Sequence, residues 1–272
     1  MENCFSVVLR VLLSCSLQAY LNKILESIKN VTTSFDPSSS QILEIEKWLF
    51  EEDQTASDGF YCKWKDIKSS FQKKQVIIVS IEGRTIGFAA WRITSRLSAV
   101  IEFTEIRPSE RGKGYSKPLL SSLFAFLKQN GVYVISLQCA PASSEVVWKK
   151  FGFEDMLLED EQSFQIKNKQ LYKTLIPCQK VSAKIPEWQY LQLWDREFIN
   201  TDPLKPTWSW NLDFIEGSEN LKVPIIYPCH YDWRIKWGMG TTCFKDCQIS
   251  KWGKQQIVFD DFLIITNLRK SN

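Results

Sequence analysis

The sequence predicts an α/β domain followed by a smaller β-rich domain, and two observations lead to this expectation. Between residues 39 and 177, stretches that alternate like strands are interleaved with stretches whose apolar residues recur every three or four positions. After residue 177 the composition changes, because seven of the eleven tryptophans and half of the ten prolines and eight cysteines fall there. We therefore expect an N-terminal helical segment and linker at 1–38, the α/β domain at 39–177 and a Trp-rich accessory domain at 178–272.

The composition excludes some classes of protein. At 272 residues and 44% hydrophobic, the chain is long enough for real cores, and its formal net charge of +3 is far from that of a dedicated duplex-DNA binder. No uninterrupted apolar run approaches the roughly 18 residues that a membrane-spanning helix needs. The cysteines lack the regular spacing of a secreted disulfide scaffold. We therefore expect a cytoplasmic protein with reduced thiols and no membrane partner.

The first 38 residues hold an apolar stretch and a polar one. "CFSVVLRVLLSCSLQAYL" resembles the core of a secretory signal, but Glu2 precedes it in place of a basic cluster and Arg10 interrupts it. This favours an amphipathic or buried helix through about Ile28. "VTTSFDPSSSQ" then has the composition of a connector, and Ser38 to Ser40 offer an N-cap to the helix "QILEIEKWLFEE".

The remaining elements of the α/β domain follow in order. After a short helix that holds Trp64 and Phe71, "QVIIVSIEGRTIGFAAWRIT" has the pattern of a β-hairpin, and "SAVIEFTEIR" makes a third strand. Apolar residues at helical spacing predict a helix over 117–129, and "VYVISLQC" is typical of a buried strand. "SSEVVWKKFGF" predicts a short helix that ends at Gly152, and residues 153–157 with "QLYKTLI" predict a last hairpin.

A glycine-rich turn, "RPSERGKGYSKPLL", connects the third strand to the helix that follows it. This arrangement allows backbone N–H groups and a helix dipole to hold a phosphate, and Arg111 and Lys113 add positive charge. Gly112 and Gly114 let the main chain approach an anion closely. The two familiar nucleotide motifs are absent, since Lys117 stands where a dinucleotide-binding G-x-G-x-x-G needs its third glycine. Alone, the turn is compatible with a phosphate loop or with a simple glycine turn.

The order of these elements, with "IRPSERGKGYSKPLLSSL" and then "WKKFGF", resembles the GCN5-related N-acetyltransferase (GNAT) family over about residues 40–177. The resemblance implies a mixed, mostly antiparallel sheet flanked by helices. It also implies an enzyme that transfers an acyl group, with acetyl favoured, from an acyl-CoA such as acetyl-CoA to an amine. The amine would attack the thioester directly, without a metal. The class of the acceptor stays open.

The resemblance also assigns roles to residues of the turn and of the strand before it. The cofactor's pyrophosphate would lie on Arg111, Gly112, Lys113, Gly114, Tyr115 and Ser116. Ile106 would bond the pantetheine arm and present its amide to the thioester carbonyl as an oxyanion donor. Glu102 and Glu105 are the candidates for the base that deprotonates the amine, and strand alternation places them on opposite faces. The alternative is that both are surface charges.

Two positions depart from the family pattern. Trp148 stands where many relatives have a tyrosine that protonates the departing thiolate, and Pro141 stands near a usual asparagine. An indole N–H is a donor but not a useful acid. Two alternatives therefore remain beside the enzyme: a catalytically weak or inactive interaction or sensing protein with this fold, and a toxin-like acetyltransferase that acts on aminoacyl-tRNA.

The accessory domain carries two weaker patterns. Cys229, His230, Cys243 and Cys247 are potential zinc ligands, but their spacing is not a strong form, so we expect buried or free thiols and no metal. The aromatic residues at 208–210 and 233–237, interleaved with basic residues, could stack nucleic-acid bases. Neighbouring acids dilute any basic patch, which favours core packing over nucleic-acid contact.

Overall fold

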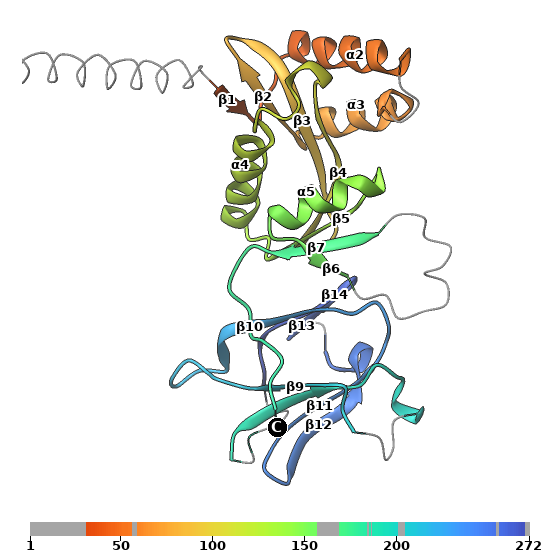
Figure 1. The fold of residues 1–272 in the computed structure, drawn as a ribbon. Coiled ribbons are helices and arrows are strands. Elements are labelled where there is room, and N and C mark those ends of the chain that lie inside the picture. The colour runs from red at the N-terminus through yellow and green to blue at the C-terminus, as the bar shows by residue number, and fades with distance from the viewer. Residues whose placement is uncertain are drawn as a thin grey trace, which may run out of the picture. The chain divides into compact units, whose positions relative to one another are not determined.

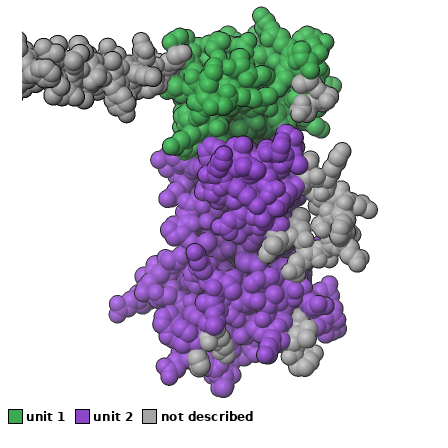
Figure 2. Space-filling model, in the orientation of Figure 1, with its two compact units in different colours: residues 1–91, 103–123 green, residues 92–102, 124–272 purple. Residues whose placement is uncertain are grey.

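The computed structural model describes residues 31–55, 59–156, 169–183, 185, 187–200, 205–253 and 256–269. The helix expected before residue 30 lies outside these residues. The chain divides into two compact units, residues 1–91 with 103–123 and residues 92–102 with 124–272 (Figure 2). None of the helices in the described ranges has the length and apolar character needed to cross a membrane.

A seven-stranded sheet organises the first part of the chain (Figure 1). Its order is β1-β2-β3-β4-β5-β7-β6. β4 and β5 pair in parallel, whereas β1–β2, β2–β3, β5–β7 and β6–β7 are antiparallel pairs. This confirms the mixed, mostly antiparallel sheet. The strands are β1 Val31–Ser34, β2 Val76–Ile81, β3 Arg84–Ile93, β4 Ser98–Ile106, β5 Val134–Gln138, β6 Glu154–Asp155 and β7 Gln170–Thr174.

Helices and short 3-10 turns connect the strands of this part of the chain. They are α2 Ser39–Asp53, α3 Trp64–Gln72, α4 Ser116–Gln129 and α5 Glu145–Lys150, with short 3-10 turns η1 Tyr61–Lys63, η2 Pro108–Glu110 and η3 Ala142–Ser144. Ser38 caps α2 and forms a capping box with Gln41, as its position before the helix predicted. Ser144 is the N-cap residue of α5, but its side chain makes no capping hydrogen bond.

Helix α2 buries one stripe of its surface against α3, β2 and β3. Ile42, Ile45 and Leu49 follow one another at three- and four-residue spacing, and each is at most 4% exposed. They belong to a core that also contains Phe88 of β3. Glu52 is the next position of the same stripe and is 8% exposed. The packing of α2 therefore carries a carboxylate into the interior.

The connector expected around residue 31 is in part a strand. Val31–Ser34 forms β1 and pairs antiparallel with β2, in a register that places Val31 opposite Ile81. β-Branched residues suit the extended backbone, and β1 completes the hydrogen bonding of β2 at that edge. Thr33 also lies 3.1 Å from Ser122 of α4, hydroxyl to hydroxyl. The polar composition of this segment did not indicate a strand, because the strand is only partly buried.

The Trp-rich part is rich in β-structure, as expected, and its strands form two sheets. One has the order β12-β11-β8-β9 and the other β10-β14-β13. Both contribute to one core that includes Trp210, Trp237 and Trp252, each at most 2% exposed, so these tryptophans serve core packing. The elements are β8 Gln189–Leu193, η5 Phe198–Asn200, β9 Trp208–Asn211, β10 Asn220–Pro228, β11 Arg234–Met239, β12 Thr242–Gln248, η6 Ile249–Lys251, β13 Ile257–Phe259 and β14 Phe262–Asn267.

Candidate functional site

The glycine-rich turn lies between η2 and the first residue of α4, Ser116. Gly112 and Gly114 have φ angles of +76° and +85°, a region that favours glycine. An added Cβ would meet no atom within 4 Å at either position, so both glycines border open space. Within the residues that the structure describes, the backbone N–H groups of residues 112–115 have no hydrogen-bond acceptor. Free N–H groups beside open space at a helix start are suited to hold an anion such as a pyrophosphate.

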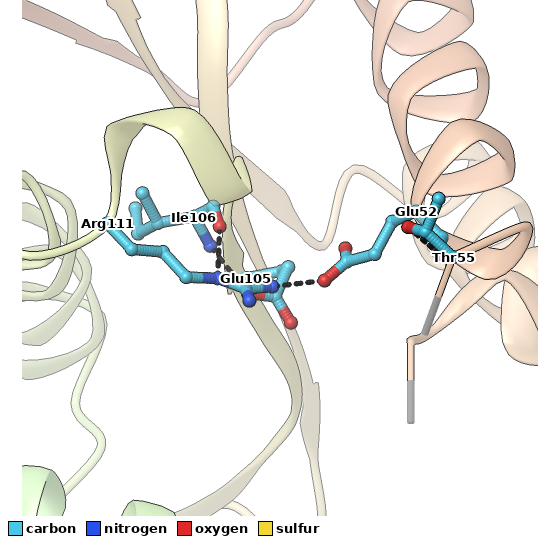
Figure 3. Close-up of polar contacts among 5 residues, drawn as sticks. All are labelled: Glu52, Thr55, Glu105, Ile106 and Arg111. Carbon is cyan, nitrogen blue, oxygen red and sulfur yellow. Dashed lines mark hydrogen bonds and ion pairs between the residues drawn. The ribbon is translucent and has the colours of Figure 1, made fainter. Parts of the chain in front are cut away.

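The two basic side chains of this turn are both engaged with carboxylates. Lys113 Nζ lies 3.0 Å from Glu110 Oε2, and Arg84 Nη2 lies 2.8 Å from the other oxygen of Glu110. The hydrogen bond from Lys113 lowers the pKa of the Glu110 carboxyl, so this carboxylate is charged at neutral pH. Arg111 points the other way, toward β4 and α2 (Figure 3). The backbone N–H groups are therefore the part of the turn that is free to bind an anion.

Arg111 joins the end of β4 to the end of α2 (Figure 3). Its Nε donates to the carbonyl of Ile106 at 3.0 Å, and its Nη2 donates to Glu105 Oε1 at 3.0 Å. The same Nη2 donates to Glu52 Oε1. Thr55 Oγ1 donates to the backbone carbonyl of Glu52 at 3.0 Å, which fixes the last turn of α2 beside the cluster. Two acids from distant parts of the sequence thus share one guanidinium.

Glu105 has the environment expected of a buried base. Its side chain is 16% exposed. Burial raises the pKa of its carboxyl above the ordinary value, Arg111 opposes this shift by charge attraction, and the negative charge of Glu52 adds to it. The hydrogen bond from the Ile106 N–H also favours the charged form. A carboxylate with a raised pKa has a greater affinity for a proton than one in solvent.

Gly87 of β3 allows the backbone of Glu105 and Ile106 to approach closely. A Cβ on Gly87 would lie 2.8 Å from the carbonyl oxygen of Glu105 and would collide with the Ile106 side chain. The N–H of Arg107 also donates to the carbonyl of Ile86 at 2.8 Å. β3 therefore supports the end of β4 through backbone contact, and the side chains of Glu105 and Ile106 depend on this fit.

Ile106 is placed at the end of β4, as the sequence predicted, and both of its backbone polar groups are engaged. Its N–H donates to Glu105 Oε1 at 3.0 Å, and its carbonyl accepts from Arg111. An oxyanion donor needs a free N–H aimed at the position of the developing charge. The Glu105 carboxylate must therefore leave this N–H before Ile106 can serve a substrate.

Glu102 has a different partner from Glu105. It forms an ion pair with Arg92, Nε to Oε1 at 2.8 Å, and its side chain is 27% exposed. Both arginine partners are about half-exposed, but Glu105 is the more buried of the two acids and shares its arginine with the buried Glu52. Of the two, Glu105 has the stronger features of a base.

The second sequence motif is packed as an aromatic cluster. The ring centroid of Trp148 lies 5.2 Å from that of Phe153 and 6.4 Å from that of Phe151. Phe124 of α4 contacts both phenylalanines, at 6.5 and 6.0 Å. Phe153 is buried. The motif therefore attaches α5 to α4 through ring contacts, with Trp148 in a packing position.

The four potential metal ligands Cys229, His230, Cys243 and Cys247 do not converge. In the part of the chain that the structure describes, no group of three or more histidine, cysteine or acidic side chains is placed to hold a metal. His230 Nδ1 lies 3.2 Å from Asp261 Oδ1. Cys229 is a buried free thiol, and Cys243 and Cys247 are also free.

Sequence reasoning missed Glu52, the acid that completes the cluster. A signal was present, because Glu52 continues the apolar stripe of Ile42, Ile45 and Leu49 at the next helical position. A charged residue within a buried stripe needs a partner, and Arg111 supplies it. The pairing itself could not be predicted, since 59 residues separate the two in the sequence.

Comparisons with known proteins give one family match and several similar solved structures. The acetyltransferase (GNAT) family model matches residues 40–153. Similar solved structures include the Ard1 protein of Thermoplasma volcanium, with 16% identity, TM-score 0.44 and coverage of 54% of this chain and 99% of that one. A GNAT-family acetyltransferase of Bacillus cereus has 15% identity, TM-score 0.44 and the same coverages. The PaiA N-acetyltransferase of Thermoplasma acidophilum, solved with coenzyme A, has 14% identity, TM-score 0.43 and coverages of 53% and 98%.

No curated protein matches the chain by sequence. The family match spans the capped helix α2, the glycine-rich turn and the aromatic motif that ends at Phe153. These are the segments that carry the resemblance in the sequence. The family model thus identifies residues 40–153 as similar to the acetyltransferase domain of the GNAT family.

Proposed function

We propose that this protein transfers an acyl group, most favourably acetyl, from acyl-CoA to the amine of an acceptor of unidentified class. The observation that carries the proposal is the glycine-rich turn at residues 111–116. Its N–H groups at 112–115 are free of assigned partners in the described structure, and Gly112 and Gly114 border open space. Backbone N–H groups with open space beside them can hold an anion such as a pyrophosphate. Acyl-CoA would supply the activated thioester.

In this proposal Glu105 is the general base. The carboxylate accepts a proton from the amine nitrogen, directly or through a water, as that nitrogen forms a bond to the acyl carbon. The carbon–sulfur bond breaks, and the departing sulfur takes a proton from solvent, because Trp148 offers only an indole N–H. When Glu105 turns toward the amine it releases the Ile106 N–H, which can then donate to the developing oxyanion. Base and oxyanion donor thus become available together.

Cofactor binding is tested by calorimetry with acetyl-CoA. We expect Gly114→Trp to abolish binding, because the indole would fill the open space beside the free N–H groups. Gly83→Trp is a matched control, since Gly83 also has a positive φ angle, +80°, and no atom within 4 Å of its Cβ position. Equal loss in both variants, or acetyl-CoA binding that survives in Gly114→Trp, would contradict the assignment of the loop.

The base is tested by comparing Glu105→Gln with Glu102→Gln in a thioester-cleavage assay across a panel of amines. We expect kcat to fall about 100-fold or more in Glu105→Gln, the usual size of a general-base contribution, and to change little in Glu102→Gln. The opposite ranking would move the role to Glu102. Acetyl-CoA binding should persist in both variants, because neither side chain belongs to the turn.

Trp148 packs among aromatic rings and offers no acid for the departing thiolate, so a non-catalytic role is the second candidate function. A protein that binds acyl-CoA tightly and cleaves no thioester with any amine would be an interaction or sensing module. Mass spectrometry of molecules that co-purify with the protein addresses the acceptor. A bound RNA, together with growth arrest on expression that Gly114→Trp removes, would support the toxin-like acetyltransferase that acts on aminoacyl-tRNA.

A further inference from the structure

We propose that Glu52, on helix α2, is a positioning residue that acts through Arg111 on the Glu105 carboxylate. The inference rests on the proposed role of Glu105 as the base, and it adds a third residue to the site. It also changes the expected role of Arg111. The Arg111 side chain serves the carboxylate at the end of β4, while the main chain of residues 111–116 serves the cofactor.

The geometry gives Arg111 little freedom. Its Nε is anchored on the carbonyl of Ile106 at 3.0 Å, and one terminal nitrogen, Nη2, donates to both Glu52 and Glu105. A guanidinium is planar and presents its donors in a fixed fork, so three simultaneous bonds define its orientation. Removal of Glu52 would release one of these bonds and leave the other two on β4. Glu52 therefore determines how Nη2 is divided between the two acids.

Glu52 is held at this place by the packing of its helix. Its side chain is 7% exposed, and no partner is assigned to its buried Oε2 within the described residues. Burial of a carboxylate with an unsatisfied oxygen is costly, and one ion pair does not remove the whole cost. A helix selected for stability alone would favour an apolar residue at the end of this stripe. The retained charge indicates a role beyond the core.

The cluster contains two carboxylates and one guanidinium, so its formal charge is negative when both acids are ionised. Glu52 and Arg111 act on the proton of Glu105 in opposite directions. The negative charge of Glu52 raises the pKa of Glu105, in the same sense as burial, whereas Arg111 lowers it. The Glu105 carboxylate also accepts a hydrogen bond from the N–H of Ile106, its neighbour on β4. The pKa of Glu105 therefore depends on its burial and on Glu52, Arg111 and the Ile106 N–H.

The test follows the titration of the Glu105 carboxyl by carbon NMR in the whole protein, with the signal assigned by its loss in Glu105→Gln. We expect Glu52→Gln to move the titration to lower pH and Arg111→Met to move it to higher pH. Arg111→Lys keeps the positive charge and should restore part of the wild-type titration. Glu51→Gln is the matched control, because Glu51 is the neighbouring acid of α2, is half-exposed and lies 3.9 Å from Arg107. It should leave the titration unchanged.

Enzyme assays give the second readout. In wild type and Glu52→Gln, the acidic limb of the pH profile of kcat/KM should shift in the same direction as the NMR titration, while the dissociation constant of acetyl-CoA stays unchanged. If no variant turns over but the NMR shifts occur as stated, the proposed function fails and the coupling of Glu52 to Glu105 stands. If Glu52→Gln and Arg111→Met shift the titration in the same direction, or Glu52→Gln does not shift it, the positioning role is wrong.

Discussion

At the scale of single residues, we predict that Gly87→Ala destabilises the protein. The added Cβ would lie 2.8 Å from the Glu105 carbonyl oxygen, a backbone atom that cannot turn away as a side chain can. Overpacking of this kind costs about 1–3 kcal/mol, which outweighs the smaller gain from replacing glycine in a strand. Urea unfolding followed by circular dichroism measures the loss in the free energy of unfolding.

Gly59→Ala is the control for this prediction. A Cβ there would have ordinary van der Waals contacts, the nearest at 3.6 Å to the side chain of Glu52. We expect its free energy of unfolding to stay within about 0.5 kcal/mol of wild type. If Gly87→Ala were equally mild, β3 would not support the end of β4 through the contact described.

The glycine-rich turn shows which features of single residues can be predicted from the sequence. Gly112 and Gly114 were expected to let the main chain approach an anion, and both have positive φ angles and border open space. Arg111 was expected beside the phosphate for its charge, yet its guanidinium contacts acids of α2 and β4. The sequence does not state which way a long side chain turns, since this depends on partners that only the fold brings near.

At the scale of elements, we predict that Ser38→Ala weakens helix α2. The Ser38 hydroxyl accepts the N–H of Gln41 and the Gln41 side chain accepts the N–H of Ser38, so two otherwise free donors of the first turn are satisfied. Loss of a cap of this type costs about 1 kcal/mol in the free energy of unfolding. Thermal unfolding should show a lower Tm in Ser38→Ala.

Ser39→Ala tests whether this effect belongs to the cap. Ser39 is the first residue of α2, is exposed, and contributes no side chain to the capping box. Alanine favours helix, so we expect a change of at most about 0.5 kcal/mol. Similar losses in the two variants would show that the capping box does not stabilise α2.

The elements of the α/β part were largely predictable because their signals are local. The cap of α2, the hairpin turn at Glu82 and Gly83, and the apolar spacing of α4 each lie within a few residues of the element they define. β1 was missed, because a four-residue edge strand of valine, threonine and serine has no alternation to detect. Its stability comes from pairing with β2, which follows more than 40 residues later.

At the scale of the whole molecule, one compact unit includes the last strands of the seven-stranded sheet and the Trp-rich sheets. A core within this unit joins Val134 of β5 and Met156 to Ile226, Phe262 and Ile264 of β10 and β14. The rings of Tyr172 and Phe262 lie 5.8 Å apart. The composition change after residue 177 marks where the aromatic content rises. It says nothing of this shared core, because packing between the regions is not encoded in local composition.

Strand β14 offers a matched pair of residues that separates the two cores of this unit. Ile264 is at most 1% exposed and packs in the core with Val134 of β5, whereas Ile265 is fully buried in the core between the two Trp-rich sheets. Their opposite directions follow from the alternation of a strand. Ile264→Ala and Ile265→Ala remove the same atoms from buried positions, and we expect each to cost about 2–5 kcal/mol in the free energy of unfolding.

We predict that these two variants differ in where stability is lost. Amide hydrogen exchange should lose protection in β5 and β7 as well as β14 for Ile264→Ala, because the cavity opens beside β5. Ile265→Ala should lose protection in β10, β13 and β14, while β5 and β7 keep that of wild type. Identical exchange patterns in the two variants would show that the unit unfolds as one body. Wild-type protection of β5 in Ile264→Ala would show that the two Trp-rich sheets do not support the seven-stranded sheet.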